Sequence, residues 1–195
     1  MPQRSPNLPA SSREHAHPLV KLLIADLARS GGTSVIEIGS GRGRNTAALS
    51  AAGLGVTAVT DDASHAPLAA ADAAFDAAIS THGFFHGLPS DAAALCAEVA
   101  RVLRSAGGLY VTLTSSSDVR CGKGARIDVD TYAAQDGPER GVPHIYYTEQ
   151  SARALLEPVF RIEEVREVAV DAIVGRWAHA DPRGMRHLFI VARRA

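Results

Sequence analysis

A glycine-rich turn between an apolar strand and a helix constrains the fold of this chain more than any other feature. The segment from Val35 to Asn45 has the sequence Val-Ile-Glu-Ile-Gly-Ser-Gly-Arg-Gly-Arg-Asn, with Glu37 two residues before the first glycine. This layout is typical of the nucleotide-binding turn of an α/β sheet, where glycines let the backbone turn sharply and approach a ligand. The helix that follows directs its free N–H groups at an anionic group of that ligand.

The spacing of the glycines distinguishes two classes of cofactor. A dinucleotide fingerprint, G-x-G-x-x-G, requires glycine at position 44, where this chain has Arg44, so a nicotinamide oxidoreductase is disfavoured. The pattern E-x-G-x-G-x-G instead resembles the first motif of class I S-adenosylmethionine-dependent methyltransferases. The resemblance implies that the loop wraps the methionine end of the cofactor and that Glu37 helps to hold its ammonium group. The cofactor contacts that it implies in the turn are Glu37, Gly39, Ser40, Gly41, Gly43, Arg44 and Asn45.

Length, charge and cysteine content narrow the class of protein. A chain of 195 residues suits one domain, and we expect residues 1–16 to form a flexible arm and residues 17–195 a single methyltransferase-like domain. The net charge of -1, without a long basic run, argues against nucleic-acid and membrane partners. The two cysteines form no C-x-x-C pair, and the proline- and serine-rich start is unlike a signal peptide. We therefore expect a cytoplasmic protein.

Hydrophobic periodicity and Gly/Pro punctuation predict an alternation of helices and strands. We expect helices at 18–28, 44–52, 91–104 and 149–157. We expect strands at 34–38, 55–60, 75–80, 109–113, 160–172 and 186–192. The fold class is α/β, a Rossmann-like, mostly parallel sheet that ends in a C-terminal antiparallel hairpin, as in the methyltransferase family. Residues 114–148 are expected to form a long irregular loop.

Two further segments carry the same resemblance. The strand at 75–80 has the sequence Phe-Asp-Ala-Ala-Ile-Ser, which is similar to the F-D-x-x-x-S of the family's fourth motif. The turn at 104–108, Arg-Ser-Ala-Gly-Gly, is similar to the L-K-P-G-G turn before the family's fifth strand. Thr81 and His82 follow the fourth-motif strand, and we expect them beside the cofactor.

The connection after the second strand is shorter than the family's. Only the 14 residues from Asp61 to Ala74 separate it from the fourth-motif strand, so we expect the usual third strand and its helix to be absent. Two alignments remain open. Asp61 is a displaced ribose-binding acid, or Asp61-Asp62-Ala63 with Pro67-Leu68 resembles the third motif and Asp62 meets the adenine.

The segment after the fifth strand is expected to carry the acceptor chemistry, because the carboxyl ends of the strands form the ligand crevice of such a sheet. Its Ser-Asp-Val-Arg-Cys-Gly-Lys-Gly and Gly-Val-Pro-His runs resemble a subgroup related to the tellurite-resistance methyltransferases. The candidate catalytic residues are His144, Arg120 and Tyr146. His144 suits a proton acceptor or a structural role equally, whereas for Arg120 an ion pair with Asp118 is favoured over an oxyanion clamp.

No metal is expected, because no carboxylate or cysteine completes a ligand set with His82, His86 and His144 at a recognisable spacing. Trp177 is expected in the core and His179 at the surface. The function expected is methyl transfer from S-adenosylmethionine to a small-molecule acceptor. The alternative is a degenerate methyltransferase fold that binds a ligand or partner without turnover. The sequence leaves the oligomeric state open and allows a homodimer.

Overall fold

A computed structural model describes residues 16–60, 67–81, 83–137, 139–170 and 183–195. Residues 1–15 of the arm predicted at 1–16 lie outside these residues, as do Asp61, Asp62, His82, Trp177 and His179. Within them, no helix combines the length and the apolar character that a membrane span requires.

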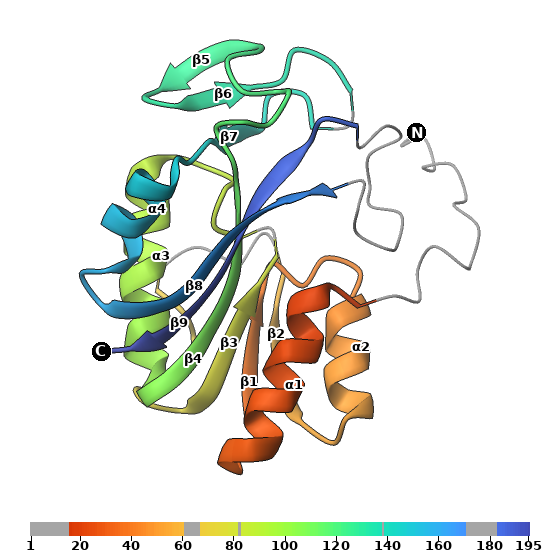
Figure 1. The fold of residues 1–195 in the computed structure, drawn as a ribbon, viewed down its shortest axis with the longest axis vertical. Coiled ribbons are helices and arrows are strands. Elements are labelled where there is room, and N and C mark those ends of the chain that lie inside the picture. Colours follow the sequence, from red (N-terminus) through yellow and green to blue (C-terminus); the bar gives the residue numbers. More distant parts are fainter. Residues whose placement is uncertain (1–15, 61–66, 82, 138, 171–182) are drawn as a thin grey trace.

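A six-stranded sheet forms the centre of the molecule, in the order β2-β1-β3-β4-β9-β8 (Figure 1). Strands β2 (Gly55–Val59), β1 (Ser34–Ile38), β3 (Phe75–Ser80) and β4 (Leu103–Thr114) run parallel to one another. Strand β9 (Arg186–Arg194) pairs antiparallel with β4 and with β8 (Phe160–Ala169). The predicted fold class, a Rossmann-like sheet ending in an antiparallel hairpin, is therefore confirmed.

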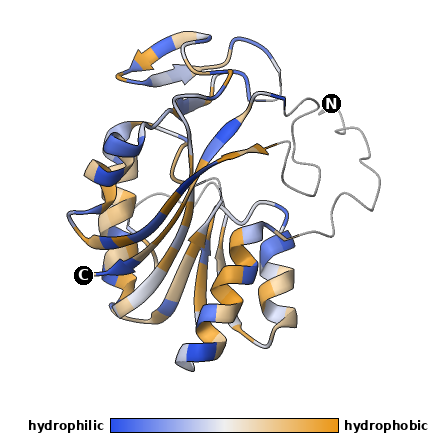
Figure 2. Ribbon diagram, viewed as in Figure 1, coloured by the Kyte–Doolittle hydropathy of each residue, from blue (hydrophilic) through white to orange (hydrophobic). Residues whose placement is uncertain are grey.

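Helices cover both faces of this sheet (Figure 1). Helices α1 (Pro18–Ser30) and α2 (Arg44–Ala51) pack on one face, and α3 (Pro89–Val102) and α4 (Glu149–Leu156) pack on the other. Because successive strand side chains point to opposite faces, Val35 packs with α1 while its neighbour Ile36 packs with α3. Both faces of the central strands are thus buried, and the sheet-facing sides of the helices are apolar (Figure 2).

Strand β2 forms one edge of the sheet. No described strand pairs with it beyond β1, and residues 67–74 contain neither helix nor strand. The fold therefore has no counterpart, among the described residues, of a third parallel strand outside β2.

The prediction of an irregular loop at 114–148 is wrong. Three short strands form a second, antiparallel sheet there: β5 (Ala125–Asp128), β6 (Thr131–Ala133) and β7 (Pro143–Ile145). Strands of three or four residues are too short to display the alternation by which a strand is recognised in a sequence. Strand β4 is also longer than the predicted 109–113, because Leu103 already pairs with Phe75 ahead of an irregularity in the ladder.

Candidate functional site

The carboxyl ends of β1, β3 and β4 meet at one edge of the large sheet, and the small sheet lies beyond that edge (Figure 1). The glycine turn leaves β1 there, and the segment after β4 returns through the small sheet. Backbone hydrogen bonds attach this sheet to the edge: Ile145 donates to the Phe85 carbonyl over 2.8 Å, and Tyr147 donates to the Thr114 carbonyl over 2.8 Å. Open α/β sheets bind ligands at this edge.

The glycine turn has the backbone shape that its sequence predicts. Gly39, Gly41 and Gly43 have φ values of 70°, 52° and 75°, in the left-handed region that glycine adopts at little cost. The N–H of Gly43 closes the turn on the Ser40 carbonyl over 2.9 Å, and Gly43 is the N-cap of α2. The turn thus delivers the start of α2 to the ligand edge of the sheet.

Glu37 lies beneath the turn with 2% of its surface exposed. Burial raises the pKa of its carboxyl, while hydrogen bonds from Thr46 and Asn45 and the charge of Arg44 act in the opposite direction. Burial likewise lowers the pKa of Arg44, and Glu37 opposes that shift. Glu37 therefore fastens the first turn of α2 to β1, in addition to any part that it has in holding a ligand.

Asn45 joins the glycine turn to two other elements. Its amide Nδ2 donates to the hydroxyl of Thr81 over 3.4 Å, and its Oδ1 accepts from the backbone N–H of His17 over 2.9 Å. Thr112 in turn donates to the Thr81 carbonyl over 2.7 Å. The structure thus brings the predicted cofactor residues of the turn together with Thr81, at the exit of β3.

The contact of His17 with the glycine turn and its capping of helix α1 were not predicted from the sequence. His17 is 1% exposed, its Nδ1 accepts the N–H of Leu19 over 3.1 Å, and its ring packs on Phe189 with centroids 4.7 Å apart. A signal was available, because a residue directly before a proline at the start of a helix occupies the N-cap position.

Arg120 forms the expected ion pair with Asp118. Its Nε and Nη2 atoms lie 2.9 and 3.1 Å from the two carboxylate oxygens, and Asp118 also accepts the backbone N–H of Arg186 over 2.8 Å. Burial raises the pKa of Asp118, but the hydrogen bonds from Arg120 outweigh it and the net shift is downward. The pair therefore ties the segment after β4 to the start of β9.

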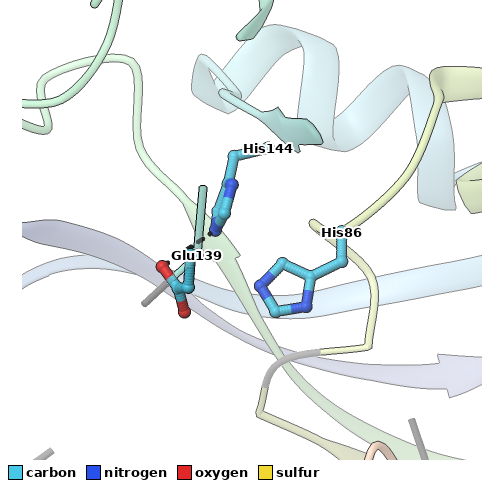
Figure 3. A group of neighbouring side chains, drawn as sticks. All are labelled: His86, Glu139 and His144. Atoms are coloured by element: carbon cyan, nitrogen blue, oxygen red, sulfur yellow. Dashed lines mark ion pairs between the residues drawn. The ribbon is translucent and has the colours of Figure 1, made fainter. Parts of the chain in front are cut away.

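The side chains of His86, Glu139 and His144 converge (Figure 3), and Glu139 lies near Arg120 of this ion pair. The Nε2 atom of His144 lies 3.3 Å from Oε2 of Glu139, and the rings of His86 and His144 are 4.7 Å apart. An Nη1 atom of Arg120 lies 3.9 Å from the same oxygen of Glu139. The predicted residues His144 and Arg120 are thus neighbours, and Glu139, which no pattern in the sequence singled out, connects them.

Tyr146 is a buried phenol near Arg120 and Asp118. Only 4% of it is exposed, its ring meets that of Tyr132 with centroids 6.0 Å apart, and burial raises the pKa of its phenol to about 12. The phenol therefore stays protonated at neutral pH and can act only as a hydrogen-bond donor or acceptor.

Comparisons with known proteins agree with the observed fold. Residues 56–111 match a family model described as a methyltransferase domain. No curated protein sequence matches the chain. Among solved structures, the chain is similar to Burkholderia thailandensis 1,6-didemethyltoxoflavin-N1-methyltransferase with bound 1,6-didemethyltoxoflavin and S-adenosylhomocysteine. The two are 21% identical over 92% of this chain and 79% of that one, with a TM-score of 0.63.

Two further solved structures are similar over most of both chains. A putative S-adenosylmethionine-dependent methyltransferase from Listeria monocytogenes is 12% identical over 91% of this chain and 98% of that one, with a TM-score of 0.63. An S-adenosylmethionine-dependent methyltransferase from Mesorhizobium loti is 19% identical over 89% and 96%, with a TM-score of 0.60. The chain therefore has the fold of these methyltransferases.

Proposed function

We propose that this protein transfers a methyl group from S-adenosylmethionine to a small-molecule acceptor. The observation that carries the proposal is the glycine turn, with three left-handed glycines at the carboxyl end of β1 above a buried acid. The matched methyltransferase domain model and the similar solved structures support the cofactor. The Ser117–Gly124 and Gly141–His144 motifs support the subgroup related to the tellurite-resistance methyltransferases.

The main chain of the turn is open to a ligand. A Cβ atom built at Gly41 would meet nothing within 4 Å, so none of the residues that the structure describes fills that face of the turn. We place the methionine end of the cofactor there, with Glu37 toward its ammonium group and Gly39, Ser40, Gly43, Arg44, Asn45 and Thr81 around it. Asp61 and Asp62 are the acids proposed for the adenosine end, and His82 for the neighbourhood of the sulfonium.

The acceptor is proposed to lie beside His144. Methyl transfer from a sulfonium is an in-line displacement, so holding donor and acceptor in line supplies most of the rate. The Nδ1 atom of His144 lies 2.9 Å from the Val142 carbonyl, which can only accept, so this nitrogen carries the proton and Nε2, which faces Glu139 at 3.3 Å, is left with the lone pair. Arg120 positions Glu139 next to it, and Tyr146 is left as a neutral polar contact.

The test is a pair of matched substitutions at left-handed glycines. Gly41 and Gly53 have φ values of 52° and 82°, and a Cβ at either position meets nothing within 4 Å of the protein. Valine costs comparable backbone strain at both sites, about 1–3 kcal/mol. We expect Gly41→Val to lose binding of S-adenosylhomocysteine in calorimetry, because its side chain occupies the ligand face, and Gly53→Val to keep it.

Two outcomes would contradict the proposal. Unchanged affinity in folded Gly41→Val would remove the turn from the binding site. Cofactor binding without methyl transfer to any acceptor in a broad screen would instead support the alternative, a methyltransferase fold that binds a ligand or partner without turnover.

A further inference from the structure

We propose that His86, Glu139 and His144 bind a divalent first-row transition-metal ion. The three side chains come from three segments: the exit of β3, the loop between β6 and β7, and β7 itself. One ligand atom from each lies within 4.8 Å of the other two. Figure 3 shows the two imidazoles and the carboxylate turned toward a common point.

The hydrogen bond at Nδ1 of His144 orients the lone pair of its other ring nitrogen toward that point. Its Nδ1–H donates to the Val142 carbonyl over 2.9 Å, so in the neutral ring the lone pair is on Nε2. That atom is buried and faces Oε2 of Glu139 at 3.3 Å. Two electron-pair donors at this distance repel, and either a proton on Nε2 or a metal ion between them would relieve the repulsion that Arg120, 3.9 Å from the same oxygen, offsets in part. The contact lacks the geometry of a hydrogen bond, so a proton fits it less well than a metal.

The backbone fixes the spacing of the two histidines. Residues 86 and 144 form an antiparallel bridge, and the N–H of Gly87 donates to the Pro143 carbonyl over 3.0 Å. The backbones of residues 86 and 144 therefore cannot move apart without breaking this attachment of the small sheet to the large one. Metal sites need such preorganised ligands, because each ligand left mobile adds an entropic cost to binding.

Outer groups orient the ligands in the way that metal sites require. A ligating histidine usually donates its second N–H to a carbonyl or carboxylate, as His144 does to Val142. Ligating carboxylates are held by hydrogen-bonding or charged neighbours in turn. Arg120 stands 3.9 Å from Glu139 and is itself held by the buried carboxylate of Asp118. The carboxylate of Glu139 is thereby kept on the side of the histidines.

The donor set selects the ion. Two imidazoles and one carboxylate suit Zn²⁺, Fe²⁺ or Co²⁺, whereas Mg²⁺ prefers oxygen ligands throughout. Metal–nitrogen bonds of about 2.1 Å place tetrahedral ligands roughly 3.4 Å apart, close to the 3.3 Å between His144 and Glu139. The side chain of Glu139 is 28% exposed, so it can rotate to close the longer separations. Three protein ligands leave at least one position open.

The open position defines a class of acceptor, an inference that rests on the proposed methyl transfer. A metal-bound hydroxyl has a lowered pKa, so the acceptor would lose its proton to solvent and remain as a bound oxyanion. Its oxygen then forms a bond to the methyl carbon while the carbon–sulfur bond breaks and its electron pair stays on sulfur, giving S-adenosylhomocysteine. Acceptors with a hydroxyl that can occupy this position are therefore favoured.

The experiment is a Co²⁺ titration of the full chain after chelator treatment, followed by visible absorption, with Zn²⁺ as competitor and Mg²⁺ in parallel. We expect one equivalent of Co²⁺ to bind, Zn²⁺ to displace it, and Mg²⁺ to have no effect. Glu139→Gln should weaken Co²⁺ binding at least tenfold, as should His86→Gln. Glu164→Gln is the matched control, because Glu164 pairs with Arg166 on β8, away from the cluster, and should bind Co²⁺ as the unchanged chain does.

Binding of S-adenosylhomocysteine, measured on the same samples, separates the two proposals. Retained cofactor binding with tenfold weaker Co²⁺ binding in Glu139→Gln supports the metal site. Absent Co²⁺ binding in the unchanged chain, or equal affinity in Glu139→Gln, overturns it and leaves an imidazolium–carboxylate pair. If the unsubstituted protein does not bind S-adenosylhomocysteine, the proposed methyl transfer is contradicted, whereas the proposed metal site is not. Circular dichroism checks that each variant is folded. If His86→Gln does not fold, the Co²⁺ affinity of Glu139→Gln alone tests the metal site.

Discussion

Asp76 is the carboxylate whose ionisation should contribute most visibly to the stability of the sheet. It is the second residue of β3, and its Oδ2 accepts from the N–H of Thr33 over 2.8 Å, the N–H of Ser34 over 2.9 Å and the Ser34 hydroxyl over 2.8 Å. Its Oδ1 pairs with Arg104 in β4. One ionised side chain therefore joins the starts of β1, β3 and β4.

The magnitude follows from the proton linkage. Burial by itself would raise the pKa of Asp76, but the backbone N–H groups of Ser34 and Thr33 lower it from 3.8 to about 2. A gap of this size corresponds to about 2.5 kcal/mol at most, and solvent screening at the partly exposed Arg104 reduces it to about 1–2 kcal/mol. Since the folded-state pKa is the lower one, this stabilisation is present above pH 4 and is lost as the pH falls to about 2.

Urea unfolding of Asp76→Asn against the unchanged chain, from pH 7 down to pH 2.5, measures this contribution. The free energy of unfolding should be about 1–2 kcal/mol lower for the variant at pH 7, and the difference should shrink as the pH falls. Asp72→Asn is the control, because its side chain is 80% exposed and its ion pair with Arg101 is a surface contact of about 0–1 kcal/mol. A difference for Asp76→Asn that stays constant across this pH range would refute the role of the charge.

Two further predictions concern the segment after β4. Asp118→Asn removes the charge that compensates the largely buried Arg120, so the free energy of unfolding should fall by about 3 kcal/mol; a loss below about 1 kcal/mol in urea would contradict a structural ion pair. Gly124→Ala places a Cβ 2.1 Å from the Ala133 carbonyl oxygen and should open the pairing of β5 with β6. Gly122→Ala, at φ 76° with nothing within 4 Å, should add only backbone strain. Hydrogen exchange at residues 125–133 compares the two, and equal protection would contradict the clash.

The strands that the sequence predicted best are those buried on both faces. β1 and β3 were predicted at their observed bounds, because each is a short apolar run with a glycine or a polar turn residue at its ends. Helix α3 begins two residues before its predicted start, at Pro89, because the Asp91 carboxylate accepts the N–H of Leu88 and caps the first turn. Local chemistry of this kind is visible in a sequence once proline at the first helical position is taken as a start signal.

The cluster of His86, Glu139 and His144 could not have been predicted in the same way. His144 and Glu139 are close in sequence but reach His86 only because β7 forms a bridge with the exit of β3. That bridge depends on a second sheet whose strands are three or four residues long. Spacing along the chain therefore gave no ligand set, and only the pairing of segments distant in sequence supplied one.

The exit of β3 connects the two halves of the proposed reaction site. Thr81 receives a hydrogen bond from Asn45 of the glycine turn, and four residues later the Phe85 carbonyl receives one from Ile145 of the small sheet. The turn proposed to hold the methyl donor and the sheet proposed to hold the acceptor are thus fastened to one short segment of chain. A displacement reaction depends on the alignment of donor and acceptor, so attachment of both sides to one segment is a feature that such chemistry requires. The same segment carries His86, one of the proposed metal ligands.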